Sequence, residues 1–221
     1  MSAVAENLQR VKERIAAACA RAGRDAGAVE LIAVSKLQPA ALIRDAYAAG
    51  QRAFGENYAQ ELRDKAAELS DARGLRWHAI GPLQTNKAKY VAKAAHVFHA
   101  LDRLDVAQEL SRRRDGGPLR CFLQIHLGDE ETKSGVAAAD AKALLEQVRA
   151  LPKLEVVGLM GLPPLMGGPE GARPWFRQLR ELAASLGLPE LSMGTTSDFE
   201  VAIEEGATCV RVGTAIFGER P

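Results

Sequence analysis

The sequence has little of what marks secreted, membrane or nucleic-acid-binding proteins. Its 221 residues include three cysteines, which form no CxxC pair, and we find no secretory leader. This favours a reducing compartment, so we expect a cytoplasmic protein. No apolar run approaches the length of a membrane span. The net charge is +1 and the pI about 7.8, so neither nucleic acid nor a membrane is expected as a partner.

The sequence also lacks a low-complexity linker and any shift in composition that would mark a domain boundary. With 47% hydrophobic residues, the chain can bury roughly 70% of its unfolded surface around one core. We therefore expect a single domain over residues 1–221. One closed domain without an obvious interface stripe is compatible with a monomer.

What the sequence does contain is an alternation of short apolar runs with helix-like stretches. Eight strands are predicted, at 31–35, 51–54, 76–80, 96–100, 119–126, 154–159, 189–193 and 208–212. Helices are predicted between them, at 39–49, 57–69, 84–94, 103–115, 137–150, 172–187 and 197–205. Such alternation implies parallel strands with right-handed crossovers. Eight units can close as a (β/α)8 TIM barrel, and an open doubly wound sheet is the competing architecture.

The two ends of the chain fit this barrel. After the last predicted strand only residues 213–221 follow, too few for a full outer helix. Spacings of three and four predict an extra helix over residues 3–22, which we expect to fill the gap. Its apolar stripe consists of Val4, Leu8, Val11, Ile15 and Ala18.

Lys36 is the residue with the clearest chemical potential, because it follows the first predicted strand directly. A lysine at the carboxyl end of a buried strand can aim its amine into a site. If that site lowers the amine pKa, the neutral amine can form a Schiff base with an aldehyde, and pyridoxal phosphate is the usual partner. The competing interpretation is a surface lysine at a strand-to-helix junction.

The loops after the last two predicted strands have the chemistry of a phosphate site. In TIM barrels a phosphate often sits on these two loops, at the start of a short helix. The first loop offers the glycine and hydroxyl residues Ser192, Gly194, Thr195, Thr196 and Ser197. The second offers Gly213 and Thr214. Helix capping uses the same residue types, and the two roles are compatible.

Arg211 ends the eighth predicted strand and could face the ring nitrogen of a cofactor held by Lys36. A cation there disfavours protonation of the nitrogen and weakens the ring as an electron sink. An ordinary structural arginine is the alternative. Asn57 follows the second predicted strand, as a helix cap or as a neighbour of the cofactor.

Four histidines and one polar loop complete the candidates. His78 lies inside a predicted strand, where a satisfied core or rim histidine is commoner than a general base, and its place in the Trp77-His78 motif makes a rim position plausible. His96, His99 and His126 show no metal-binding spacing, so we expect no metal site. Lys133 lies in a polar loop on the expected functional rim. We predict that it makes a second aldehyde or phosphate contact when cofactor enters or leaves.

Several motifs give the chain a strong resemblance to a known family. They are Ala33-Val34-Ser35-Lys36, Phe54-Gly55-Glu56-Asn57-Tyr58, Trp77-His78, Ile80-Gly81-Pro82-Leu83-Gln84-Thr85-Asn86-Lys87, Lys133-Ser134-Gly135, Gly158-Leu159-Met160, Leu191-Ser192-Met193-Gly194 and Arg211-Val212-Gly213-Thr214-Ala215-Ile216-Phe217-Gly218. Over nearly its whole length the chain resembles the pyridoxal phosphate homeostasis proteins, relatives of the barrel domain of alanine racemase.

The resemblance implies a (β/α)8 barrel like the N-terminal domain of alanine racemase, with pyridoxal phosphate on Lys36. It implies that Asn57 lies near the cofactor and that Arg211 faces the pyridine nitrogen. The implied phosphate site consists of Ser192, Gly194, Thr196, Gly213 and Thr214. His78, Lys133 and Met160 are candidates for accessory contacts.

One departure from the family pattern falls in the implied phosphate site. The family usually has Gly-Met-Ser where this chain has Gly194-Thr195-Thr196. Threonine keeps the hydroxyl and adds a methyl group, so we expect the phosphate contact to survive with local repacking.

The resemblance implies a binding protein that buffers or delivers pyridoxal phosphate inside the cell, without established turnover. Apo enzymes that use this cofactor are the implied recipients. The alternative is a small amino-acid racemase, whose two-base route needs a second acid–base group opposite Lys36. Tyr47, Tyr58 and Tyr90 all fall in predicted helices as packing or surface residues, and no convincing second group is found. A barrel that binds another phosphorylated metabolite without a Schiff base is a third possibility.

Overall fold

Eight parallel strands form a closed barrel in the computed structural model, which describes residues 2–128, 134–164 and 167–219. The strands are β1 (Glu30–Val34), β2 (Ala53–Glu56), β3 (Arg76–Ala79), β4 (Val97–Leu101), β5 (Leu119–Ile125), β6 (Leu154–Gly161), β7 (Glu190–Thr195) and β8 (Cys209–Val212). Each strand pairs with the next, and β8 closes the ring by pairing with β1, with Arg211 opposite Ile32. The predicted TIM barrel is therefore confirmed, and the open sheet is excluded.

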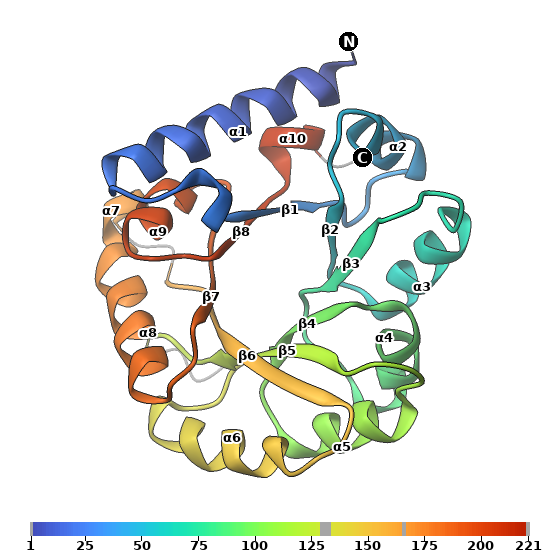
Figure 1. Ribbon diagram of the computed structural model, residues 1–221, viewed down its shortest axis with the longest axis vertical. Helices are drawn as coiled ribbons and strands as arrows, with labels where there is room; N and C mark the ends of the chain where they lie inside the picture. Colours follow the sequence, from blue (N-terminus) through green and yellow to red (C-terminus); the bar gives the residue numbers. More distant parts are fainter. Residues whose placement is uncertain (1, 129–133, 165–166, 220–221) are drawn as a thin grey trace.

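Helices surround the strands, as Figure 1 shows. They are α1 (Ala3–Arg21), η1 (Ala26–Ala28), α2 (Ala40–Ala48), α3 (Ala59–Glu68), η2 (Thr85–Lys87), α4 (Ala88–Ala94), α5 (Leu104–Arg113), η3 (Ala138–Asp140), α6 (Ala141–Arg149), α7 (Gly168–Gly171), α8 (Arg173–Ser185), α9 (Phe199–Glu204) and α10 (Thr214–Phe217). Within the described part of the chain, none of them is long and apolar enough to cross a membrane.

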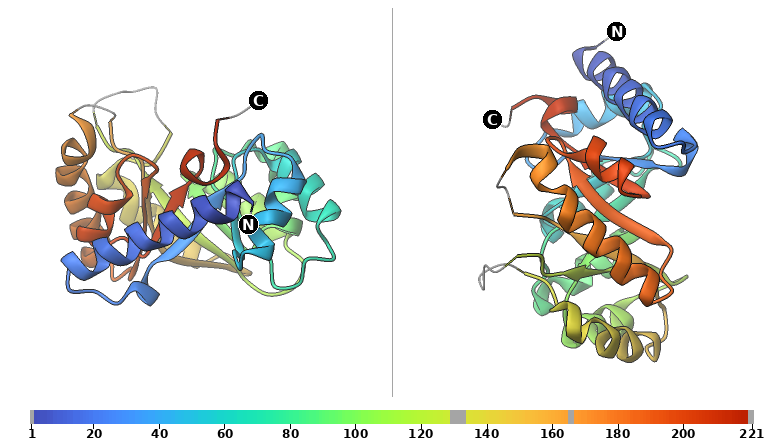
Figure 2. Two further views of the ribbon diagram at one scale, coloured as in Figure 1. Left: turned by 90° about the horizontal axis from the view of Figure 1, so that it is seen from above. Right: turned by 90° about the vertical axis from the view of Figure 1, so that its left-hand side faces the viewer.

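The N-terminal helix α1 fills the gap in the outer ring, as predicted. It lies beside α9 and the four-residue α10, which is the one helix after β8 in the described part of the chain (Figure 1 and Figure 2). The predicted stripe of α1 is buried, and Asn7 Nδ2 donates a hydrogen bond to the carbonyl of Ile216 at 3.0 Å. Arg14 pairs with Glu200 at 2.8 Å. The start of the chain thus covers the place where the last helix is too short.

Strand β2 lies two residues further along the chain than predicted, at Ala53–Glu56 instead of 51–54. Gln51 is not part of the strand. Its amide is buried and donates to the carbonyls of Leu31 and Ala53 at 2.6 and 2.8 Å. Position 55 has little room for a side chain, since a Cβ there would lie 3.0 Å from Cγ2 of Ile32, and glycine avoids this close contact.

Two predicted helix starts are also late in the structure. Helix α3 begins at Ala59, with Tyr58 at the N-cap position, so Asn57 does not cap it. Helix α9 begins at Phe199 instead of residue 197. In both places the residues expected in the first helical turn belong to the loop after a strand, where they are available to a site.

The core has two parts, the barrel interior and the layer between strands and helices. All three cysteines are buried in it. Burial raises the pKa of Cys121 and of Cys209 to about 12, because an apolar environment disfavours a thiolate. They behave as small hydrophobic residues.

Candidate functional site

Lys36 lies at the carboxyl end of the barrel, two residues beyond the end of β1. It borders a pocket of about 190 Å³ that is formed by the ends of β1, β2, β3, β6, β7 and β8. The lining residues are Val34, Lys36, Asn57, Ile80, Leu162, Thr195, Thr196, Arg211, Gly213 and Thr214. The closed barrel brings the last two strands beside the first. Six of the predicted site residues therefore meet in one place.

Three other cavities are larger, two at about 430 Å³ each and one at about 270 Å³, and the two largest differ from the Lys36 pocket in chemistry. One of these two lies between α1 and the starts of β1 and β2, at the opposite end of the barrel. The other lies on the same rim as Lys36 and shares Asn57 with the smaller pocket. Compared with these cavities, the pocket at Lys36 combines a lysine, a buried arginine and two consecutive threonines. We therefore assign the candidate site by chemistry and not by size.

The loops after β7 and β8 are tied together beside this pocket. The backbone N–H of Gly213 donates to Thr196 Oγ1 at 3.2 Å. A Cβ on Gly213 would lie 3.3 Å from the Val34 carbonyl oxygen, so glycine allows the β8 loop to approach β1 closely. Asp198 accepts hydrogen bonds from the backbone N–H and the hydroxyl of Thr195, at 2.6 and 3.0 Å. The loop is thus held from within.

Gly194 serves this loop through packing and does not line the pocket. Its φ of +91° lies in the left-handed region, which favours glycine. A Cβ there would lie 2.6 Å from the Cβ of Ala202 and 2.9 Å from Cα of Phe199. Glycine lets the end of β7 lie directly against α9. The sequence predicts a role for Gly194 in the phosphate site, whereas the structure shows a role in packing β7 against α9.

Arg211 reaches the pocket from β8 and is 4% exposed. Its Nη1 donates to Ser192 Oγ at 2.5 Å, and its Nη2 donates to the carbonyl of Gly161 at 3.2 Å. Burial lowers the pKa of Arg211, and the nearby Asp198 opposes this effect. Because an arginine stays protonated even so, the pocket has a fixed cation at its floor.

Ser192 is engaged in the barrel interior and does not border the pocket, contrary to the prediction that it binds phosphate. The residue is fully buried. Its Oγ accepts from Arg211, which leaves its hydroxyl hydrogen for His99 Nδ1 at 2.8 Å. His99 Nε2 lies 2.9 Å from His78 Nδ1. Since a neutral imidazole has one donor and one acceptor, His99 donates to His78.

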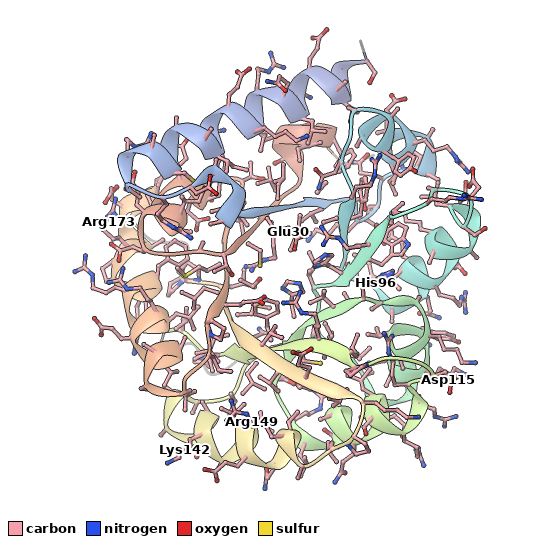
Figure 3. The ribbon with its side chains drawn as sticks, viewed as in Figure 1. Glu30, His96, Asp115, Lys142, Arg149 and Arg173 are labelled. Atoms are coloured by element: carbon pink, nitrogen blue, oxygen red, sulfur yellow. The ribbon has the colours of Figure 1, made fainter. Side chains whose placement is uncertain are left out.

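His78 lies inside the barrel and faces its amino end, so of the core and rim positions that the sequence left open it takes the core position. Its Nε2 lies 4.0 Å from a carboxylate oxygen of Glu30, the first residue of β1, at the barrel opening seen in Figure 3. Burial, with Arg76 nearby, lowers the pKa of His78 to about 3. The pKa of His99 is lowered well below its usual value for the same reason. Both imidazoles are neutral.

The other predicted residues that the structure describes lie apart from the pocket. Met160 is buried in β6 beside Ser192 and does not border the pocket. His96 accepts a hydrogen bond from the backbone N–H of Trp77 and is structural. Lys133 lies outside the described residues. In the described ranges, no group of three potential metal ligands comes together.

A buried ionic cluster behind Lys36 was missed by sequence reasoning. Lys65 Nζ donates to Glu56 Oε1 at 2.8 Å and to Glu61 Oε1 at 2.7 Å. The spacing of four between Glu61 and Lys65 on a helix is a signal that could have indicated their pairing. No pattern in the sequence connects either of them to Glu56 or to the Lys36 turn.

Comparison with known proteins agrees with this geometry. The family model for the alanine racemase N-terminal domain matches residues 2–221. A relative from Pseudomonas aeruginosa, named pyridoxal phosphate homeostasis protein, is 49% identical, with 100% of this chain and 97% of the relative covered. A relative of the same name from Aquifex aeolicus is 46% identical, with 97% of each chain covered.

Solved structures show the same relationship. PipY of Synechococcus elongatus, solved with pyridoxal phosphate bound, is 40% identical with a TM-score of 0.85, covering 97% of this chain and all of PipY. Alanine racemase from Corynebacterium glutamicum shares the fold with a TM-score of 0.72 at 21% identity, and the chain covers 61% of it. The chain therefore belongs to the alanine racemase N-terminal domain family, together with the pyridoxal phosphate homeostasis proteins.

Proposed function

We propose that this protein binds pyridoxal 5'-phosphate and takes part in its homeostasis, holding the cofactor reversibly as a Schiff base on Lys36. The observation that carries the proposal is the meeting of Lys36, the Thr196–Gly213 loops and Arg211 around one pocket. The relatives named for this function, and PipY with the cofactor bound, support it.

The residues present fit the chemical groups of the cofactor. A phosphate requires hydroxyl and backbone N–H donors, and the pocket lining offers them at Thr196, Gly213 and Thr214, whereas Thr195 already donates to Asp198. The aldehyde requires an amine, which is Lys36. A polar ring edge can be met by Asn57 and by the guanidinium of Arg211. When bound, the cofactor supplies a reactive aldehyde, and the protein supplies its orientation.

Each residue would have a distinct task. The ends of β7 and β8 would hold the phosphate, and Lys36 on the neighbouring strand would hold the aldehyde. Arg211 would keep the ring nitrogen unprotonated, because its own proton is retained and its charge is fixed by Ser192 and Gly161. Such a site favours storage over carbanion chemistry, which requires a strong electron sink.

The whole chain would act as one cofactor-binding barrel. We propose that it works in the cytoplasm as a monomer and passes cofactor to apo enzymes that depend on it. Three buried free thiols support a reducing compartment. The prediction that Lys133 assists cofactor transfer also stands as a proposal.

Loading of the purified protein tests the function. Incubation with pyridoxal phosphate should give visible absorbance, and borohydride reduction should fix the cofactor to the peptide that contains Lys36. Lys36→Ala should abolish the fixed adduct while leaving the fold intact by circular dichroism. A wild type that takes up no cofactor would refute the proposal. Racemisation of amino acids that depends on Lys36 would favour the racemase alternative.

A further inference from the structure

The chain on both sides of Lys36 is tied to structure outside the barrel. The carbonyl of Ser35 accepts a hydrogen bond from Lys65 Nζ at 2.7 Å. The backbone N–H of Leu37 donates to Glu61 Oε1 at 2.6 Å. Lys65 and Glu61 both belong to α3, which packs outside β2 and β3. The turn that presents Lys36 to the pocket is thus fastened from behind by one helix.

Leu37 makes this fastening necessary. Its φ is +61°, in the left-handed region that non-glycine residues avoid. The residue is 48% exposed, so packing of its side chain does little to offset the strain. Such a conformation persists only where surrounding contacts impose it, and the hydrogen bond from Leu37 to Glu61 is one such contact.

The fastening consists of buried charges. Glu56 is 1% exposed and Lys65 is 7% exposed. Ser35 Oγ donates to Glu56 Oε1 at 2.6 Å, the same oxygen that accepts from Lys65. Burying an ionic cluster costs desolvation free energy, and apolar residues of similar volume would stabilise the fold as well. Unlike apolar contacts, these hydrogen bonds fix specific atoms of the turn. Lys65 binds the Ser35 carbonyl, and Glu61 binds the Leu37 N–H.

We propose that Glu56, Glu61 and Lys65 are positioning residues that hold the Lys36 turn against α3 and so slow the release of cofactor from Lys36. The proposal rests on the proposed function, because it concerns the rate at which Lys36 exchanges its ligand. None of the three residues borders the pocket. They act through the backbone of Ser35 and Leu37.

The charge state of Glu56 gives the cluster a recognisable signature. The titratable groups that face Glu56 are Lys65 and Glu61, both from α3, and Ser35 is its neutral partner. Burial raises the pKa of Glu56 to about 7, and the hydrogen bond and charge of Lys65 oppose this effect. Protonated Glu56 is a weaker acceptor for Lys65 and Ser35. The turn should therefore be held less firmly below neutral pH.

Amide exchange of the cofactor-free protein tests the fastening directly. In Glu61→Ala the Leu37 N–H loses its acceptor, so its exchange should accelerate roughly tenfold or more. Lys142→Met is the matched control, since Lys142 lies on the exposed outer side of α6 (Figure 3). That variant should leave Leu37 exchange unchanged. Exchange in Glu61→Ala at the wild-type rate would overturn the proposal.

Cofactor release tests the consequence. After loading, pyridoxal phosphate is chased with an excess of an amine trap, and the decay of visible absorbance is followed. Lys65→Met should release cofactor about tenfold faster than wild type, and Lys65→Arg should recover part of the difference. Lys142→Met should release at the wild-type rate. Equal rates in Lys65→Met and wild type would overturn the proposal.

The two experiments separate the failures. A wild type that takes up no cofactor refutes the proposed function, while the Leu37 amide still reports on the fastening. If Lys65→Met does not fold, Glu56→Gln replaces it, because glutamine keeps the shape and removes the titration. The wild-type release rate should then show an inflection near neutral pH that Glu56→Gln lacks. The same inflection in both proteins would count against the proposal.

Discussion

Two buried polar networks lie on opposite sides of the barrel wall and serve the same site differently. The inner network runs from Arg211 through Ser192 and His99 to His78. It must cross the barrel interior, because β7 and β4 are not neighbours in the ring. The outer network joins Glu56 and Lys65 between the strands and α3. The inner one fixes a cation at the pocket floor, and the outer one fixes the turn at Lys36.

The two networks differ in how they deal with charge. The inner one contains a single charge, and its imidazoles are neutral because burial lowers the pKa of both. The outer one contains three ionisable groups, of which Glu56 has a pKa raised to about 7. Protonation of the buried imidazoles in acid therefore costs fold stability in the inner network, and ionisation of buried Glu56 in alkali costs it in the outer one. The ionised Glu56 is nevertheless the stronger acceptor for Lys65 and Ser35, so the Lys36 turn is held most firmly in alkali. Because the two networks make stability change with pH in opposite directions, unfolding measurements at several pH values can test each network separately.

The largest expected effect concerns His78 in acid. Its pKa is about 3 in the folded protein, against an ordinary value of 6.5, so the unfolded chain binds more protons between these values. Wild-type stability should fall as pH falls below 6.5, by about 1.4 kcal/mol per pH unit for this group. His78→Gln removes the contribution, which amounts to about 3 kcal/mol near pH 4.

Urea unfolding of both proteins near pH 7 and near pH 4 measures this effect. The difference between the two pH values cancels whatever packing the substitution costs at both. Parallel pH profiles for wild type and His78→Gln would show that His78 is charged in the folded protein, and the inner network would then not be neutral.

The next largest effect has the opposite sign and belongs to Glu56. Its folded pKa of about 7 exceeds the ordinary value of 4.5, so the folded protein binds the extra proton in this window. The stabilising contribution is present below pH 4.5 and is lost as pH rises through 7. Relative to Glu56→Gln, the wild type should lose about 2–3 kcal/mol between pH 5 and pH 8.

Guanidinium unfolding at the two pH values, in buffers of equal ionic strength, provides the measurement. Lys142→Met serves again as the control, and its pH profile should follow that of the wild type. A wild type that gains stability relative to Glu56→Gln as pH rises would mean that Lys65 outweighs burial.

The barrel could be predicted from the sequence because its strands and helices are marked by local patterns of apolar residues. Alternating apolar runs set the strands, and closure follows from their number and the right-handed crossovers. Closure pairs β1 with β8, and the residues that follow these strands, Lys36 and Gly213, therefore lie at the same pocket. The stripe on α1 likewise predicts its burial, because a period of 3.6 residues depends on near neighbours alone.

What the sequence could not provide is the direction of side chains that meet across the barrel. Ser192 and Gly194 stand in the predicted phosphate loop, but strand β7 extends to Thr195 and turns Ser192 into the interior. His78 has the same composition signal whether it faces the rim or the amino end. Glu56 belongs to β2, which ends two residues later than its composition indicates, and it pairs there with Lys65 from α3.

A smaller effect is expected from Ser192→Ala in the inner network. The substitution leaves Arg211 Nη1 and His99 Nδ1 without the hydroxyl that joins them. Leaving buried polar groups unsatisfied costs about 1–3 kcal/mol, and we expect about 2 kcal/mol here. The loss should be the same at pH 7 and pH 8.5 because neither imidazole titrates there. A loss that varies over this interval would place a titrating group inside the barrel.

The smallest effect is expected from Ser35→Ala, the matching serine of the outer network. Ser35 Oγ donates to Glu56 at 2.6 Å, and Lys65 continues to satisfy the same oxygen after the substitution. We expect a loss of about 1 kcal/mol near pH 8.5, where Glu56 is ionised and a hydrogen bond to it is strongest. Near pH 5.5 the loss should be smaller, because the acceptor is then a neutral carboxyl. Unfolding of Ser192→Ala and Ser35→Ala in parallel therefore separates the two sides of the wall: equal pH dependence in both variants would contradict the distinction between a neutral interior and a titrating exterior.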